Sequence, residues 1–349
     1  MIRNAAFYLY PSVEAAKKGE NFGGTGFLIG EPSKKHGKYG RAHIYAVTNW
    51  HVAVQGSPVI RFNTQSGPPD IFDIDVTDWF FDGKHDIAVL PINVAPNKHA
   101  VTVLHSQMLV TRENLAAAQI GPGDDVFMVG RFMDHDGGQR NRPALRFGNI
   151  AMDPTPIMQS NKVSVDAYCI DLHSRSGYSG SPVFVYRTPQ SDLDLPPPKR
   201  DSVLGLATPS ETSTFFMVLG IHFAQFPETW EVSTSGKLLH QSENAQSPLL
   251  TGTHYIQGLS GMTCVLPAWA IREVLDMPKL KKMREETEEN SEANFRRDGY
   301  PPLSEDNRWT QDVPVSEAAA PPANGENPKH REDFTRLVNA AARKQEPEG

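Results

Sequence analysis

Short apolar runs recur along the first 280 residues, each bounded by Gly, Pro, Asn or Asp. They are rich in Val, Ile, Phe and Tyr, which are enriched in β-strands. We expect strands at residues 43–49, 71–79, 86–92, 125–132, 163–171, 181–186, 215–223 and 261–267. A helical pattern follows Pro267, where Ile271, Val274 and Leu275 fall on one side. Many short strands followed by one C-terminal helix indicate a β-barrel or sandwich rather than alternating β-α-β units.

The composition changes near residue 280. Charged residues make up 26 of the last 69 positions, against 49 of the first 280. A segment with low hydrophobicity and scattered proline cannot bury enough apolar surface to offset its chain entropy. We therefore expect a folded body over residues 1–280 and a charged, largely disordered linker over 281–326. A Pro-rich stretch at 187–214 interrupts the strands, and we expect it to form an extended surface loop or a hairpin.

The last segment, residues 327–349, has a different pattern. Asn327 and Pro328 form a helix-start signal. Apolar residues then recur at helical spacing on one face: Phe334, Leu337, Val338 and Ala341. The pattern predicts a short amphipathic helix. Two interpretations stay open, a docking motif for a protein partner or for the body, and a marginal terminal helix with no role.

Charge and cysteine content exclude several classes of protein. The 349 residues carry a net charge of −7 without a basic block, which argues against nucleic acid or an anionic membrane as partner. No apolar run is long enough to span a membrane, and no signal peptide is evident at the start. Two cysteines cannot form a disulfide scaffold, so we expect a reducing cytoplasm. No His or Cys spacing predicts a metal site.

Three segments at strand boundaries carry the candidate chemistry: 48–52, 85–90 and 177–182. They supply His51, Asp86 and Ser179 in that order. A serine hydroxyl becomes a nucleophile when a base takes its proton, a carboxylate orients the base, and donors stabilise the oxyanion. The order His, Asp, Ser distinguishes the chymotrypsin-like triad from the subtilisin and α/β-hydrolase triads. Gly177 lets the backbone turn its amides inward, so the N–H groups of Gly177 and Ser179 are the candidate oxyanion hole.

Taken together, these motifs resemble those of the trypsin-like (chymotrypsin-fold) serine peptidases. GGTGFLIG, TNWHV, HDIAVL, SGYSGSPVFV and GLSGMTCVLPAWAIREVL carry the resemblance, which covers roughly residues 5–278. It implies an all-β fold of two antiparallel six-stranded barrels with a C-terminal helix. The active site would lie in the cleft between the barrels. The first barrel would contribute His51 and Asp86, and the second Ser179.

Within that family the details are similar to the staphylococcal glutamyl endopeptidase branch. By that resemblance His222 lines the specificity pocket, together with Ser174 and His173, and meets an acidic substrate side chain. The alternative for His222 is a strand histidine bonded to the backbone. Two features depart from the branch: the long spacing from Ser179 to His222, and an N-terminus that enters a predicted strand without an obvious propeptide.

The sequence thus predicts a cytoplasmic serine endopeptidase that acts on protein or peptide substrates without a cofactor, with a possible preference for cleavage after Glu or Asp. Two other functions stay open. One is a binding or scaffold module with the peptidase fold and no turnover. The other is a latent peptidase activated by a protein partner at the C-terminal tail.

Overall fold

The fold is given by a computed structural model. It describes residues 2–34, 42–95, 97–131, 138, 140–159, 162–172, 178–187, 215–232, 238–241 and 254–297. The predicted loop at 187–214 lies outside this part of the chain, apart from Arg187, and so does the predicted helix at 327–349. Residues 1–293 form one compact unit.

The first sheet is antiparallel along a path of six strands, in the order β5-β4-β1-β2-β3-β6. Its strands are β1 (Ala6–Tyr10), β2 (Gly24–Pro32), β3 (Ala42–Thr48), β4 (Val59–Phe62), β5 (Asp70–Phe72) and β6 (Ala88–Pro91), with β7 (Val103–His105) parallel to β2. Within the described residues β5 and β6 do not pair with each other, so the sheet is a half-barrel.

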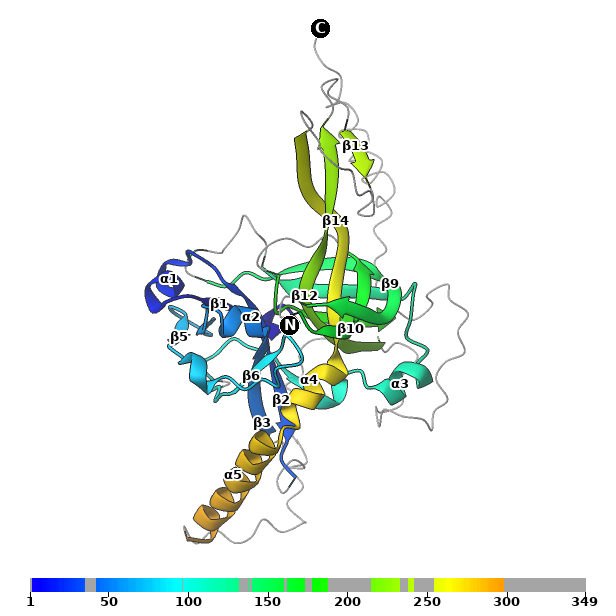
Figure 1. Cartoon of the computed structure of the whole chain (residues 1–349). Helices are drawn as coiled ribbons and strands as arrows, with labels where there is room; N and C mark the ends of the chain where they lie inside the picture. Colours follow the sequence, from blue (N-terminus) through cyan, green and yellow to red (C-terminus); the bar gives the residue numbers. More distant parts are fainter. Residues whose placement is uncertain are drawn as a thin grey trace, which may run out of the picture. The chain divides into compact units, whose positions relative to one another are not determined.

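The second sheet closes on itself. Its strands are β8 (Asp125–Gly130), β9 (Ala144–Met158), β10 (Ser164–Asp171), β11 (Pro182–Arg187), β12 (Phe215–Val232), β13 (Leu238–Gln241) and β14 (His254–Pro267). They follow the order β11-β8-β9-β10-β14-β12-β13, and a pairing of β11 with β12 completes a six-stranded ring. The outer parts of β12 and β14, with β13, extend beyond the ring (Figure 1). The prediction of an all-β fold with two antiparallel six-stranded barrels is confirmed as two antiparallel six-stranded sheets, of which the first is a half-barrel and the second a closed ring.

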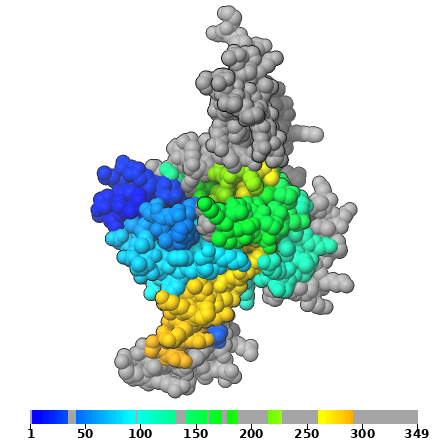
Figure 2. Space-filling model, in the orientation of Figure 1, coloured from blue at the N-terminus to red at the C-terminus, as the bar shows by residue number. Residues whose placement is uncertain are grey.

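The central strand β2 is buried on both faces, which explains its continuous apolar sequence. Phe27 and Ile29 pack into a core shared with the second sheet. Leu28 points the other way, as alternation along a strand requires, and packs into a separate core of the first sheet. The two sheets therefore meet across β2 and β3, and Figure 2 shows the blue and cyan surface of the first sheet adjoining the green surface of the second.

The helices are short except at the end of the compact unit. They are α1 (Val13–Lys18), α2 (Trp50–Ala53), α3 (Arg112–Ala117), α4 (Ala268–Leu275) and α5 (Pro278–Arg297), with 3-10 turns at Ile2–Ala5, Val76–Asp78 and Ser106–Met108. Helix α4 lies where the pattern after Pro267 predicts it. Its residues Ile271, Val274 and Leu275 are fully buried.

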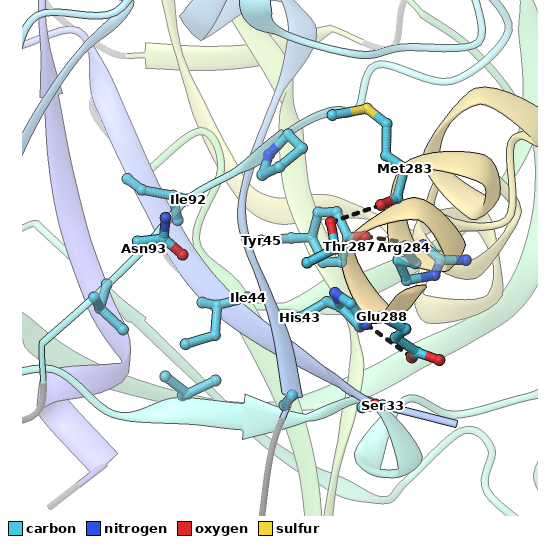
Figure 3. A pocket seen from close by; sticks show the side chains of 14 residues that line it. Ser33, His43, Ile44, Tyr45, Ile92, Asn93, Met283, Arg284, Thr287 and Glu288 are labelled. Atoms are coloured by element: carbon cyan, nitrogen blue, oxygen red, sulfur yellow. Dashed lines mark hydrogen bonds and ion pairs between the residues drawn. The ribbon is translucent and has the colours of Figure 1, made fainter. Parts of the chain in front are cut away.

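Helix α5 covers the start of the predicted linker, up to Arg297, and residues 298–326 lie outside the described residues. Polar contacts attach it to the first sheet (Figure 3). Glu288 accepts a hydrogen bond from the Lys34 backbone at 2.9 Å and pairs with His43 at 3.0 Å, and Arg284 donates to the Tyr45 hydroxyl at 3.0 Å. Leu280 is fully buried at its start. Ion pairs and hydrogen bonds thus join this highly charged helix to the first sheet.

Candidate active site

The structure brings His51 and Asp86 together at one edge of the first sheet. His51 lies in the first turn of α2, just after β3, and Asp86 lies just before β6. Strands β3 and β6 are antiparallel, with Thr48 opposite Ala88, so the end of one lies beside the start of the other. The His51 Nδ1 atom is 2.6 Å from Asp86 Oδ2, and the His51 backbone N–H donates to Asp86 Oδ1 at 2.9 Å.

This contact orients the imidazole. Asp86 is 3% exposed, whereas the His51 side chain is 27% exposed. A buried carboxylate favours the tautomer that carries its proton on Nδ1, which leaves Nε2 as an acceptor. A histidine held in this way can act as a general base through Nε2, which lies on the side of the ring away from the carboxylate.

Two side-chain amides hold the backbone of Asp86. Asn49 Nδ2 donates to the Asp86 carbonyl at 2.7 Å, and the Asp86 N–H donates to Gln159 Oε1 at 2.8 Å. Asn49 lies between β3 of the first sheet and α2, whereas Gln159 directly follows β9 of the second sheet. Sequence reasoning missed Gln159 because it is 73 positions from Asp86 and lies in no motif.

Ser179 lies in a tight turn that leads into β11. The Ser181 N–H donates to the Tyr178 carbonyl at 2.9 Å, and the Gly180 N–H donates to the His222 carbonyl at 2.9 Å. The Ser179 carbonyl accepts from the Thr25 N–H of β2 at 2.8 Å. The turn is therefore bonded on one side to its own sheet and on the other to the sheet that carries His51.

Close backbone packing at two glycines places Ser179 beside the His51 helix. A Cβ atom at Gly24 would lie 3.1 Å from the Ser179 carbonyl oxygen and 2.6 Å from Cγ1 of Val52, the residue after His51. A Cβ atom at Gly180 would lie 1.9 Å from the Thr25 carbonyl oxygen and 2.4 Å from Thr48 Oγ1. The two glycines therefore let the Ser179 turn approach β2 and the residues that flank His51 more closely than a side chain would allow.

His222 lies beneath the Ser179 turn and is 1% exposed. Burial, reinforced by the nearby His51, lowers the pKa of His222 to about 3, although a hydrogen bond to the Tyr178 backbone acts in the opposite direction. His222 is therefore neutral at ordinary pH. Its hydrogen bond to the Tyr178 backbone is the contact expected of a strand histidine, and its role in a specificity pocket stays a prediction. The other predicted pocket residues, His173 and Ser174, and the predicted oxyanion donor Gly177 lie outside the described residues.

Tyr178 fixes the start of the turn. Its side chain is fully buried, and Arg146 Nε of β9 donates to its hydroxyl at 2.9 Å. Trp50, next to His51, packs edge-to-face on Phe81 with 6.1 Å between ring centroids. Both aromatic residues beside the candidate triad are thus held by neighbours of their own sheet.

A cavity of about 730 Å³ lies between α5 and the first sheet, but its lining contains none of the candidate triad (Figure 3). Among the described residues, no three His, Cys, Asp or Glu side chains are grouped to bind a metal ion. The described helices include none with the length and apolar character needed to cross a membrane.

Comparison with known proteins gives structural similarity only. No protein-family model and no curated protein sequence matches the chain. Its structure is similar to the MamO protease domain of Magnetospirillum magneticum, with 15% identity and a TM-score of 0.41, over 78% of this chain and 96% of that one. It is also similar to the HtrA-type protease AlgW with a decapeptide, with 16% identity and a TM-score of 0.39, over 73% of this chain and 51% of that one.

The chain is also similar to the active form of the Rv3671c protease from M. tuberculosis, with 15% identity and a TM-score of 0.39, over 78% of this chain and 80% of that one. Likeness at this level concerns the arrangement of strands and transfers no activity. The function of this chain must therefore be argued from its own side chains.

Proposed function

We propose that the chain is a serine endopeptidase in which Ser179 is the nucleophile, His51 the general base and acid, and Asp86 the residue that orients His51. The observation that carries the proposal is the His51–Asp86 pair, at 2.6 Å, on the edge against which the Ser179 turn is bonded. A buried carboxylate, a partly exposed imidazole and an adjacent serine are the groups that acyl transfer needs.

The proposed reaction follows from these positions. His51 Nε2 takes the proton of the Ser179 hydroxyl as its oxygen attacks the carbonyl carbon of a peptide bond. Asp86 stabilises the imidazolium that forms, and the amides of Gly177 and Ser179 donate to the oxyanion. His51 then protonates the leaving amine, and an acyl-enzyme remains on Ser179. Water, deprotonated by His51, hydrolyses the acyl-enzyme and restores the serine.

Labelling with a fluorophosphonate probe tests the nucleophile directly. We expect the wild-type chain to be labelled and Ser179→Ala to be unlabelled with its fold intact. Ser181→Ala is the matched control, because it removes a neighbouring hydroxyl that is fully buried. Equal labelling of Ser179→Ala and wild type would overturn the assignment. A folded wild-type chain that takes no label and cleaves no peptide would favour a binding module with the peptidase fold.

The preference for acidic residues belongs to the same proposal. Its support is the match of His222 to the pocket histidine of the glutamyl endopeptidase branch. Because His222 is buried and neutral, it would meet a Glu or Asp side chain as a hydrogen-bond donor rather than as a cation. A peptide library should then give cleavage after Glu or Asp, weakened in His222→Gln. A profile dominated by basic or aromatic residues would refute this part alone.

The cytoplasmic setting is also part of the proposal. Its support is the low cysteine content, since two thiols in 349 residues are typical of proteins in reducing compartments. Immunolocalisation of the expressed chain would test it, and recovery of the chain outside the cell would contradict it.

A further inference from the structure

Gln159 is a buried amide that contacts the segment leading to Asp86 at two points. It follows β9 of the second sheet and is 4% exposed. Its Oε1 accepts the Asp86 N–H at 2.8 Å, and its Nε2 donates to the Lys84 carbonyl at 2.8 Å. One side chain therefore satisfies both backbone groups that face it across the segment 84–86.

The backbone around Gln159 fixes the position of this amide. The Gln159 N–H donates to the Val163 carbonyl at 3.0 Å, and the Lys162 N–H donates back to the Gln159 carbonyl at 3.0 Å. Nε2 also approaches the Val163 carbonyl at 3.3 Å. Because both ends of the residue are bonded, the amide has a defined direction.

The segment that Gln159 holds is fixed on its other side by Asp82. The Asp82 carboxylate accepts the His85 backbone N–H at 2.8 Å and contacts His85 Nδ1 at 2.7 Å. Asn49 holds the Asp86 carbonyl at 2.7 Å. Among these contacts the bonds from Gln159 are the ones that come from the second sheet.

We infer that Gln159 is a positioning residue for the proposed triad, because its amide aligns the Asp86 backbone so that the carboxylate meets His51. The inference rests on the proposed function. Without the amide, the Lys84 carbonyl loses one donor and the buried Asp86 N–H loses its acceptor. Because an unpaired buried N–H is costly, the change favours a shift of the segment toward another partner. A displacement of about 1 Å in a catalytic constellation lowers the rate by about a hundredfold.

The test compares Gln159→Met with wild type. Met has a similar length and no hydrogen-bonding amide, so it removes both bonds and leaves the volume nearly unchanged. We expect kcat to fall by about 10- to 100-fold, with KM within about twofold of wild type, because the substrate-contacting surface is retained. Gln65→Met is the matched control: its Nε2 donates to the His99 carbonyl at 3.2 Å, so it also removes an amide–carbonyl bond.

A second readout does not require turnover. A short His51–Asp86 hydrogen bond shifts its Nδ1 proton far downfield in a proton NMR spectrum, and loss of the signal in His51→Ala assigns it. We expect that resonance to move upfield or broaden in Gln159→Met and to stay in Gln65→Met. If Gln159→Met does not fold, Gln159→Asn retains the amide on a shorter side chain and should show the same shift.

The outcomes separate the inference from the proposed function. A Gln159 variant with wild-type kcat and an unchanged resonance overturns the inference and leaves the peptidase assignment standing. If the wild-type chain shows the resonance but no peptidase activity, and Gln159→Met moves or broadens that resonance, the result supports positioning by Gln159 and refutes the proposed function. A fall in kcat with an unchanged resonance also overturns the inference, because the effect would not pass through Asp86 and His51.

Discussion

Gly180 offers the sharpest test of how the Ser179 turn is held against the first sheet. Its φ of +84° lies in the left-handed region, where a Cβ atom is unfavourable. In Gly180→Ala that Cβ would also lie 1.9 Å from the Thr25 carbonyl oxygen. Ordinary contacts between carbon and oxygen begin at about 3.3 Å, so the turn or β2 must move by more than 1 Å.

The expected loss of stability has three parts. The left-handed backbone costs about 1–2 kcal/mol for Ala. Overpacking against backbone costs about 1–3 kcal/mol. The movement also strains the hydrogen bond from the Thr25 N–H to the Ser179 carbonyl, worth about 1 kcal/mol. Together these give a loss of about 3–6 kcal/mol, or a fall in Tm of about 6–24 °C at 2–4 °C per kcal/mol.

Gly123→Ala separates conformational strain from close packing. Gly123 has a φ of +97°, but a Cβ atom there would have no neighbour within 4 Å. Gly123→Ala should therefore lose only the stability that the left-handed backbone costs, about 1–2 kcal/mol. The measurement is the denaturation midpoint of both variants by circular dichroism, with fluorophosphonate labelling in parallel. Equal losses in the two variants would show that the turn does not pack against β2 as described.

Two further predictions concern buried groups. The pKa of His222 is about 3 in the folded chain against 6.5 for a free histidine, so between these values the unfolded chain binds a proton that the folded chain does not. The free energy of unfolding should therefore fall as the pH drops from 6.5 toward 3, and it should fall less steeply in His222→Gln. Urea titrations that give the same pH dependence for both proteins would contradict this. Cys169 and Cys264 lie opposite each other on strands β10 and β14, and burial together with the nearby Cys169 raises the pKa of Cys264 to about 12. Iodoacetamide should therefore label both thiols only after the protein is unfolded. Rapid labelling of the native protein would refute their burial.

The elements that the sequence predicts well are those whose local pattern agrees with their environment. Residues 43–49, 86–92 and 181–186 lie in or at the bounds of β3, β6 and β11, because their apolar residues are buried there. The predicted strand at 71–79 is largely wrong. Strand β5 ends at Phe72, and the Asp75 carboxylate accepts the Thr77 N–H at 2.8 Å, which favours a 3-10 turn.

Other features depend on contacts that no local pattern carries. Strand β9 contains Pro154 and Pro156, and its Phe147 is 63% exposed, so neither composition nor burial marks it as a strand. Helix α5 is attached by Glu288 to a strand some 245 positions away. In the candidate site, the order of His51, Asp86 and Ser179 could be predicted from motifs, but the amides that hold Asp86 could not.

The candidate triad is divided between two sheets, so its geometry depends on how they meet. The first sheet supplies His51, Asp86 and Asn49, and the second supplies Ser179 and the Gln159 amide that bonds to Asp86. Even the His51–Asp86 pair, which lies within the first sheet, depends on the second sheet, because the buried Asp86 N–H donates to Gln159 Oε1 of that sheet. The close contact of Gly180 with Thr25 and the bond of Gln159 to Asp86 are two of the places where the sheets meet near these residues. Substitutions where the sheets meet should for this reason affect stability and catalysis together, although they touch none of the three reacting side chains.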